Sequence, residues 1–389
     1  MRELAEGMYR LSGEGALSVL ERVRELEHQG KNVYRLEIGQ PDFPTPIEIK
    51  KAGVEAIEKN QTEYVATGGM QTLKEAIQDE IETTRGFRPS LGQILVLPGA
   101  KPGIFFSIVA TCSKGDEVIL PDPGFPTYGS VCDYVGAKSV TIRLKVENDF
   151  RITPDEVASR ITPRTKLILL NSPHNPTGSV MTKKDMEQVA ELARENDCFI
   201  LADEIYSKLV YDTEFFSPSL ADESKEMSII VDGFSKSYSM TGWRLGYVVG
   251  PERFMEKLGL LFLNALTCTA PFVQIAGITA LKGSQDGVQR MLQEYRTRRD
   301  LIVKGLNEVS GFSCYTPSGA FYAWPNIMET GMTSQEVATL LLEKGSVAAL
   351  PGTAFGENGE GYLRFSYATS KETIHAALER VKALIEEET

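Results

Sequence analysis

The sequence predicts an α/β fold in which helices cover both faces of a mostly parallel central sheet, followed by a smaller α+β domain. Helix-like and strand-like patterns alternate along most of the 389 residues, which is the order expected of parallel strands joined by crossover helices. The strand-like runs before residue 250 are short and apolar on both faces, as in strands buried between helices. After about residue 280 the pattern changes and predicts a separate, smaller sheet with helices on one side.

Each element rests on its own periodicity. Apolar residues that recur every three or four positions predict helices at 16–29, 47–59, 71–85, 104–110, 183–195, 252–263, 290–309 and 371–387. Short apolar runs predict the strands of the central sheet at 94–97, 117–120, 139–144, 166–170, 199–202, 229–231 and 246–249. The smaller sheet is predicted from the runs at 320–324, 347–350 and 362–366.

The composition favours a small-molecule ligand. A formal net charge of −12 and a sequence pI near 5.0 argue against nucleic acid or an anionic membrane as a partner. No hydrophobic signal segment follows residues 1–6, so we expect a cytoplasmic protein. The five cysteines have no CxxC spacing and the three histidines form no HExxH pair, so we expect no metal site.

A lysine follows one of the predicted strands. The run at 229–231 ends shortly before Ser235 and Lys236, so both side chains should emerge where polar loop chemistry begins. A lysine amine can condense with an aldehyde when burial or a neighbouring positive charge lowers its pKa. Arg244, a little further along the chain, would supply such a charge and could hold a phosphate. The alternative is that Lys236 and Arg244 are two solvated surface charges.

Other segments also follow strands, where open α/β sheets bind ligands. Gly99 and Ala100 open a predicted helix, whose first N–H groups would cradle a phosphate. Asp203 stands where the apolar run at 199–202 ends. Arg364 lies in an alternating strand among aromatic residues, and its planar guanidinium suits a carboxylate. A solvent-facing arginine on an edge strand is the alternative for Arg364.

These positions belong to longer segments that occur in a fixed order. They are GQPDFPTP at 39–46, PGAKPG at 98–103, DPGFPTY at 122–128, NSPHNPTG at 171–178, LADEIY at 201–206, GFSKSYSMTGWRLG at 233–246 and GYLRFSYA at 361–368. In this order the segments resemble those of the class I/II pyridoxal-phosphate-dependent aminotransferases of fold type I. The resemblance covers nearly the whole chain and is to the bacterial and archaeal aspartate or broad-specificity branch.

The resemblance implies pyridoxal phosphate as the cofactor and a role for each matching residue. Lys236 would be catalytic and would bind the cofactor. The other cofactor-binding residues would be Gly99, Ala100, Lys101, Phe125, Asn175, Asp203, Tyr206, Ser235 and Arg244. Phe125 would stack on the ring, Asp203 would pair with its nitrogen, and Asn175 and Tyr206 would share its phenolic oxygen. The substrate would be bound by Gly39, Asn175 and Arg364. Tyr64 would reach the neighbouring subunit's phosphate in a homodimer with shared sites.

The resemblance also implies a reaction and a domain plan. An amino group would move between an L-amino acid and a 2-oxo acid by a ping-pong mechanism. Two alternatives remain: β-elimination by a C–S lyase of the same fold, and a non-catalytic cofactor-sensing domain. The second is disfavoured because no basic helix-turn-helix segment precedes the domain. Residues 47–280 would form the large domain, and residues 1–46 and 281–389 the small domain.

Some positions depart from the family pattern. Gly233 stands where many relatives have a second phosphate-binding serine, and Gln40 replaces a usual glutamate. Lys101 matches a position that faces the distal carboxylate of the substrate in some aspartate-type relatives, but EGAL at 14–17 lacks the hydroxyl residues that accompany it. A preference for acidic substrates is therefore left open, as is the cis or trans state of the bonds before Pro173 and Pro176.

Overall fold

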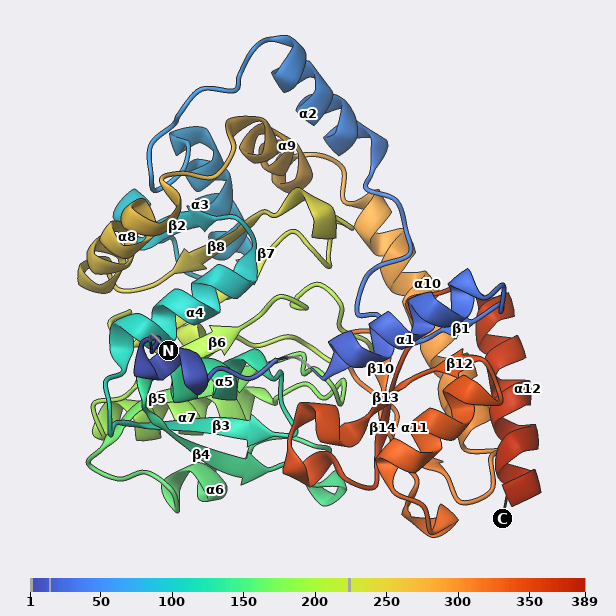
Figure 1. The fold of residues 1–389 in the computed structure, drawn as a ribbon. Helices are drawn as coiled ribbons and strands as arrows, with labels where there is room; N and C mark the ends of the chain where they lie inside the picture. The colour runs from blue at the N-terminus through green and yellow to red at the C-terminus, as the bar shows by residue number, and fades with distance from the viewer. Residues whose placement is uncertain (1–2, 14, 223–224, 389) are drawn as a thin grey trace.

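A computed structural model describes residues 3–13, 15–222 and 225–388, and it confirms the predicted α/β fold (Figure 1). The helices are α1 (Ala16–His28), α2 (Ile47–Glu58), α3 (Gln71–Arg85), α4 (Ala100–Thr111), α5 (Thr127–Val135), α6 (Pro154–Ala158), α7 (Lys183–Glu195), α8 (Glu252–Leu266), α9 (Pro271–Lys282), α10 (Asp286–Leu306), α11 (Ser334–Glu343) and α12 (Lys371–Glu388). The strands are β1 (Tyr34–Arg35), β2 (Ile94–Leu97), β3 (Glu117–Asp122), β4 (Lys138–Arg143), β5 (Thr165–Asn171), β6 (Phe199–Asp203), β7 (Ser228–Gly233), β8 (Gly246–Val249), β9 (Ser313–Cys314), β10 (Tyr322–Ala323), β11 (Pro325–Asn326), β12 (Val347–Ala348), β13 (Leu350–Pro351) and β14 (Leu363–Ser366).

The central sheet has seven strands in the order β2-β8-β7-β6-β5-β3-β4. Its strands are parallel except for β8, which runs antiparallel to both of its neighbours. β5, β6 and β7 extend beyond the predicted apolar runs to a polar residue or a glycine, namely Asn171, Asp203 and Gly233. The pairing of β5 with β6 extends to these polar residues, since Asn171 lies opposite Asp203. The carboxyl ends of β5 and β6 therefore bring polar side chains together.

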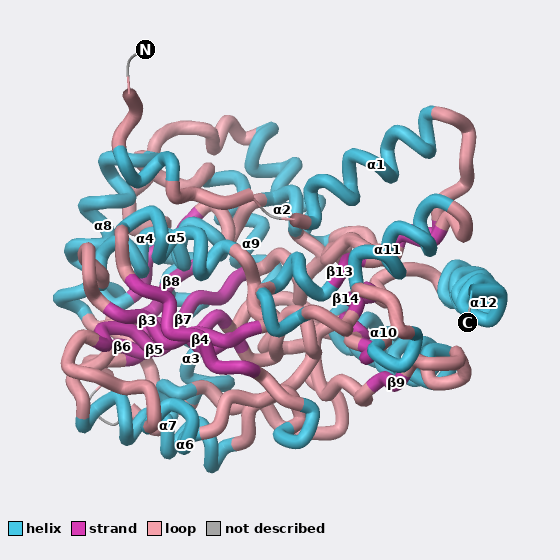
Figure 2. Tube along the Cα trace, turned by 60° about the horizontal axis from the view of Figure 1, so that its bottom comes forward, coloured by secondary structure: helices cyan, strands magenta, loops and turns pink. Residues whose placement is uncertain are grey.

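Helices cover both faces of this sheet, as the apolar runs predicted. Alternate residues of a strand point to opposite faces, so Leu167 and Leu169 of β5 pack in the layer of α4, α5 and α8. Ile168 and Leu170 pack in the layer of α6 and α7. Figure 2 shows α4, α5 and α8 on one side of the sheet and α6 and α7 on the other. On the same face as α6 and α7, the helices α3 and α9 pack against β2 and β8.

The second part of the chain differs from the prediction in how its strands pair. The run at 347–350 was expected to be one strand of a single smaller sheet. Instead it divides into β12, which pairs with β1 in parallel, and β13, which pairs with β14. Three short sheets result, with the orders β1-β12, β10-β14-β13 and β11-β9. The sequence could not show this, because β1 is only two residues long and lies far from β12 in the chain.

Helices α5, α6, α9 and α11 were not predicted. Proline stands at the first turn of α6 and α9, where it is tolerated, so a proline that reads as a loop signal in fact begins a helix.

The division of the chain into residues 47–280 and the two flanking segments stays a prediction. The peptide bonds before Pro123, Pro173 and Pro176 are cis. Within the part of the chain that the structure describes, no helix is long and apolar enough to cross a membrane.

Candidate active site

A cavity of about 430 Å³ lies at the carboxyl ends of the central strands. Of the residues that sequence analysis selected, all but Gly99 and Tyr64 line it: Gly39, Ala100, Lys101, Phe125, Asn175, Asp203, Tyr206, Ser235, Lys236, Arg244 and Arg364. Gly39 comes from the segment before α2 and Arg364 comes from β14, so both ends of the chain contribute to the cavity. Its charged lining is mostly basic, because Glu37 and Asp203 are its acidic members.

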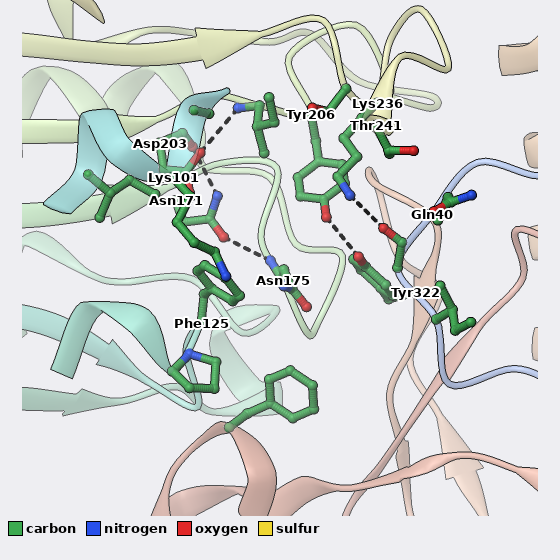
Figure 3. Close-up of a pocket in the computed structure, with 18 of the residues that line it drawn as sticks. Gln40, Lys101, Phe125, Asn171, Asn175, Asp203, Tyr206, Lys236, Thr241 and Tyr322 are labelled. Carbon is green, nitrogen blue, oxygen red and sulfur yellow. Dashed lines mark hydrogen bonds between the residues drawn. The ribbon is translucent and has the colours of Figure 1, made fainter. Parts of the chain in front are cut away.

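Lys236 projects into this cavity from the loop after β7 (Figure 3). Its Nζ donates a hydrogen bond to the carbonyl oxygen of Gly39 at 2.5 Å. Burial, together with the charges of Arg364 and Arg244, lowers the pKa of Lys236 from 10.5 to about 8. A substantial share of this amine is therefore neutral near physiological pH, which is what a nucleophile or a general base requires.

Asp203 lies at the last position of β6 and is only 4% exposed. Its Oδ2 accepts a hydrogen bond from the Tyr128 hydroxyl at 2.7 Å, and its Oδ1 accepts one from the Ile205 N–H at 3.3 Å. Burial raises the pKa of Asp203 to about 6, although the Tyr128 hydrogen bond opposes the rise. Asp203 is thus a carboxylate that is able to hold a cation in the cavity.

A polar chain connects the loop after β5 with Arg364. Asn171 donates to the backbone oxygen of Asp203 at 2.9 Å and accepts from the N–H of Asn175 at the same distance. The Asn175 Oδ1 in turn accepts a hydrogen bond from Arg364 at 3.0 Å. Arg364 also donates to the Glu37 backbone oxygen at 2.5 Å and is only 5% exposed. The guanidinium is therefore held in place before any ligand arrives.

The first turn of α4 faces Arg244. Gly99 has φ +99°, and a Cβ at this position would lie 2.4 Å from Nη2 of Arg244, so only glycine allows the guanidinium to approach so closely. The helix start leaves backbone N–H groups without an intrahelical acceptor. Ser235 and Arg244 line the same cavity. Together they form a cationic, donor-rich pocket that suits a phosphate.

Lys101 and Phe125 meet at another wall of the cavity. The Lys101 Nζ lies 5.0 Å from the centre of the Phe125 ring, which is within the range of a cation–π contact. Figure 3 shows both side chains on the same side of the cavity as Asn175. The cavity therefore presents a flat aromatic face with a positive charge beside it.

Tyr64 and Gly233 are not among the residues that line the cavity. Tyr64 is 86% exposed. Gly233 is buried, and a Cβ there would lie 2.9 Å from the Cα of Gly246, so a serine at this position would require the two strands to move. Glu14 lies outside the described residues, and the side chains of Ala16 and Leu17 are likewise not described.

Three residues in or beside the cavity have contacts that sequence analysis did not anticipate. Tyr322 lines the cavity and bonds the Tyr206 hydroxyl at 2.7 Å. Tyr128 bonds Asp203, as described above. Glu204, which follows Asp203, is paired with the buried Arg85 at 2.8 Å. Tyr128 stands in the quoted segment at 122–128, and Tyr322 lies in the aromatic run at 320–324, so aromatic clustering was the only available signal.

The sequence and the fold match known proteins along nearly their whole length. The family model described as aminotransferase class I and II matches residues 31–381. An aspartate aminotransferase of Pyrococcus abyssi is 39% identical over 92% of each chain. The aromatic-amino-acid aminotransferase 2 of Thermococcus litoralis is 37% identical over 95% of this chain and 96% of its own. The aspartate aminotransferase of Thermus thermophilus, solved with maleate, superposes with a TM-score of 0.95 at 34% identity, covering 99% of this chain and all of its own.

The fold and the cavity define a fold type I enzyme. The chain belongs to the class I and II aminotransferase family, and it is an aminotransferase.

The first test concerns the amine of Lys236 in the ligand-free protein. We expect competitive acetylation, followed by mass spectrometry of the peptide that contains Lys236, to give a half-maximal rate near pH 8. The Arg364→Leu variant should move this midpoint upward, because one of the positive charges that disfavour the ammonium is removed. A midpoint near 10.5, the ordinary value, would show that the amine is not buried among these charges.

Proposed function

We propose that this chain binds pyridoxal phosphate through Lys236 and moves an amino group between L-aspartate or L-glutamate and a 2-oxo acid. The observation that carries the proposal is the distribution of charge in the cavity. Lys236, with its lowered pKa, stands among Lys101, Arg244 and Arg364, and Asp203 is buried close to it. Such a site suits a ligand with several negative charges and one positive atom.

The residues present fit this cofactor. A phosphate would bind at the first turn of α4, where Ser235 and Arg244 line the cavity and the absence of a Cβ at Gly99 leaves room for the guanidinium. Asp203 would hold the positively charged ring nitrogen. Phe125 offers its ring face. Asn175 and Tyr206, the latter buried, would bind the phenolic oxygen through hydrogen bonds.

Pyridoxal phosphate bound there would supply an aldehyde that captures the substrate's amine and a ring that withdraws electrons from the adjacent carbon. Lys236 Nζ would take the proton from the substrate's α-carbon and later deliver it, because its pKa near 8 allows both forms. Asp203, ionised above about pH 6, would stabilise positive charge on the ring nitrogen. Arg364 would fix the α-carboxylate and thereby orient the bond that breaks.

Lys101 would bind the second carboxylate of an acidic substrate. It lines the cavity together with Arg364, so the two cations can receive the two ends of a dicarboxylate. Relatives named aspartate aminotransferase support this specificity, and the Thermus relative was solved with maleate, which is also a dicarboxylate. Every relative reported above is an aminotransferase, which favours amino-group transfer over β-elimination and over a cofactor-sensing role.

The enzyme would be a homodimer with shared active sites. Tyr64 lies outside the cavity and is exposed, so its hydroxyl would serve the site of a second copy. Large apolar side chains are exposed elsewhere too: Leu260, Leu263 and Leu266 on α8 are 51%, 45% and 46% exposed. Leucines spaced three apart lie on one side of a helix, and an exposed apolar side of this kind suits an interface. We also propose a cytoplasmic location, which agrees with five cysteines that are all free thiols. Recovery from a periplasmic or membrane fraction would contradict it.

The absorbance spectrum tests the cofactor and the reaction together. Protein loaded with pyridoxal phosphate should show a visible band that shifts when excess L-aspartate or L-glutamate is added. The Lys236→Ala variant should bind the cofactor without a covalent bond and lose turnover by about 10⁴-fold or more, because the proton-transfer group and the nucleophile are lost together. A wild-type protein without any cofactor band, or a fully active Lys236→Ala variant, would refute the proposal.

Two cavity variants test the substrate. Arg364→Leu should lower kcat/KM for every α-amino acid by about 10²-fold or more, because a buried charged contact is lost. Lys101→Met should lower it about tenfold for aspartate and glutamate alone. Lys304→Met, at an exposed lysine of α10, is the matched control. Equal losses across acidic and aromatic donors in Lys101→Met would overturn the assignment of Lys101.

Mixing two defective variants tests the shared site. A hybrid of Lys236→Ala with Tyr64→Ala carries one intact site if Tyr64 acts across the interface. Random exchange should therefore restore about a quarter of the wild-type sites, as two-fold symmetry requires. No recovery in mixtures that sedimentation shows to contain hybrid dimers would place Tyr64 outside the partner's site.

A further inference from the structure

Tyr322 is a residue of the cavity to which no role has yet been given. It lies in β10, is only 1% exposed and lines the cavity opposite the sheet ends. Its hydroxyl lies 2.7 Å from the hydroxyl of Tyr206, although the two residues are 116 positions apart in the chain. Figure 3 shows the two phenols pointing toward each other beside Lys236.

The ring of Tyr322 makes a second contact. The guanidinium carbon of Arg364 lies 4.4 Å from the centre of this ring and 4.7 Å from that of Phe355. Because β10 pairs with β14, with Tyr322 opposite Ser366, the ring and the guanidinium are set by one strand pair. The flat face of a tyrosine attracts such a cation.

The hydroxyl of Tyr322 also packs on the backbone at Gly39. A Cβ at Gly39 would lie only 2.2 Å from this oxygen, so the phenol fills the space that any other residue would need. The Gly39 carbonyl is the acceptor for Lys236. Tyr322 therefore contacts Tyr206, Arg364 and the segment that receives the lysine.

The protons of the two phenols can be assigned. Burial raises the pKa of Tyr206 well above its ordinary value, and burial also raises the pKa of Tyr322. Both hydroxyls thus stay protonated near neutral pH, and one donates to the other. The charged groups that face this pair are Arg364, Asp203 and Lys236, whose Nζ lies 5.9 Å from the Tyr206 ring.

When the Tyr206 hydrogen is directed at an acceptor in the cavity, the hydrogen in the contact between the two phenols must come from Tyr322. A donor that itself accepts a hydrogen bond becomes a stronger donor. The contact at 2.7 Å would then strengthen whatever hydrogen bond Tyr206 makes to a ligand.

We propose that Tyr322 is a positioning residue with two separable parts: its hydroxyl orients and strengthens Tyr206 toward the cofactor's phenolic oxygen, and its ring supports Arg364 for the substrate's carboxylate. This inference rests on the proposed function. The hydroxyl acts on the cofactor and the ring acts on substrate affinity, so two substitutions distinguish them.

Tyr322→Phe removes the hydroxyl and keeps the ring. In the substrate-free holoenzyme, the pH at the midpoint of the absorbance change should then rise by roughly half to one pH unit. The reason is that the hydrogen bond from Tyr206, which stabilises the anionic phenolic oxygen of the cofactor, is weakened. We expect kcat to fall about two- to tenfold, with KM for L-aspartate within about twofold of the wild type. Tyr367→Phe removes a buried hydroxyl that lies 3.4 Å from a backbone oxygen and outside the cavity. It is the matched control and should leave the midpoint, kcat and KM unchanged.

Tyr322→Leu removes both parts. It should show the same rise in the absorbance midpoint and, in addition, raise KM for L-aspartate by about three- to thirtyfold, because the cation–π support of Arg364 is lost. Reconstitution with the cofactor and circular dichroism establish that each variant is folded.

The outcomes separate the two proposals. A wild-type protein that takes up no pyridoxal phosphate contradicts the proposed function itself. A normal wild-type holoenzyme with a Tyr322→Phe midpoint equal to that of Tyr367→Phe overturns the role of the hydroxyl. Equal KM values in Tyr322→Phe and Tyr322→Leu overturn the role of the ring.

Discussion

Charge buried at the ends of parallel strands is the constraint on which the rest of the site depends. Asp203, Glu204 and Asp232 lie within or directly after β6 and β7 and are each less than 5% exposed. Arg85, at the end of α3, donates to Glu204 at 2.9 Å and to Asp232 at 2.6 Å. Because unpaired buried charges are strongly destabilising, this arginine allows acidic strand ends to exist in the interior. Asp203 is the one that remains directed at the cavity.

Buried charge also determines the properties of the cationic side of the cavity. Lys236 lies beside Arg364 and Arg244, and its amine donates a hydrogen bond to the neutral carbonyl of Gly39. Positive charges gathered in this way repel one another, and the lysine is the member whose pKa can fall, since a guanidinium keeps its proton. Burial, together with the fixed positions of the two arginines, therefore keeps the pKa of the Lys236 amine low.

Local sequence predicted those parts of the fold and site that depend on neighbours in the chain. The seven central strands and the positions of Lys236 and Asp203 follow from apolar runs that end in polar residues. The contacts of Tyr322 and Arg85 do not, because each joins segments more than 100 residues apart. The division of the run at 347–350 was missed for the same reason: its partner β1 is a two-residue strand near the other end of the chain.

The parallel pairing of β1 with β12 bears on the order of events during synthesis. All seven strands of the central sheet lie between residues 94 and 249, and domains generally fold as units while the chain is still being made. Residues 34–35 must wait for residues 347–348, and Lys236 must wait for Arg364, before the cavity closes. The sheet strands therefore leave the ribosome well before Arg364 does, and the cavity is complete only in the finished chain.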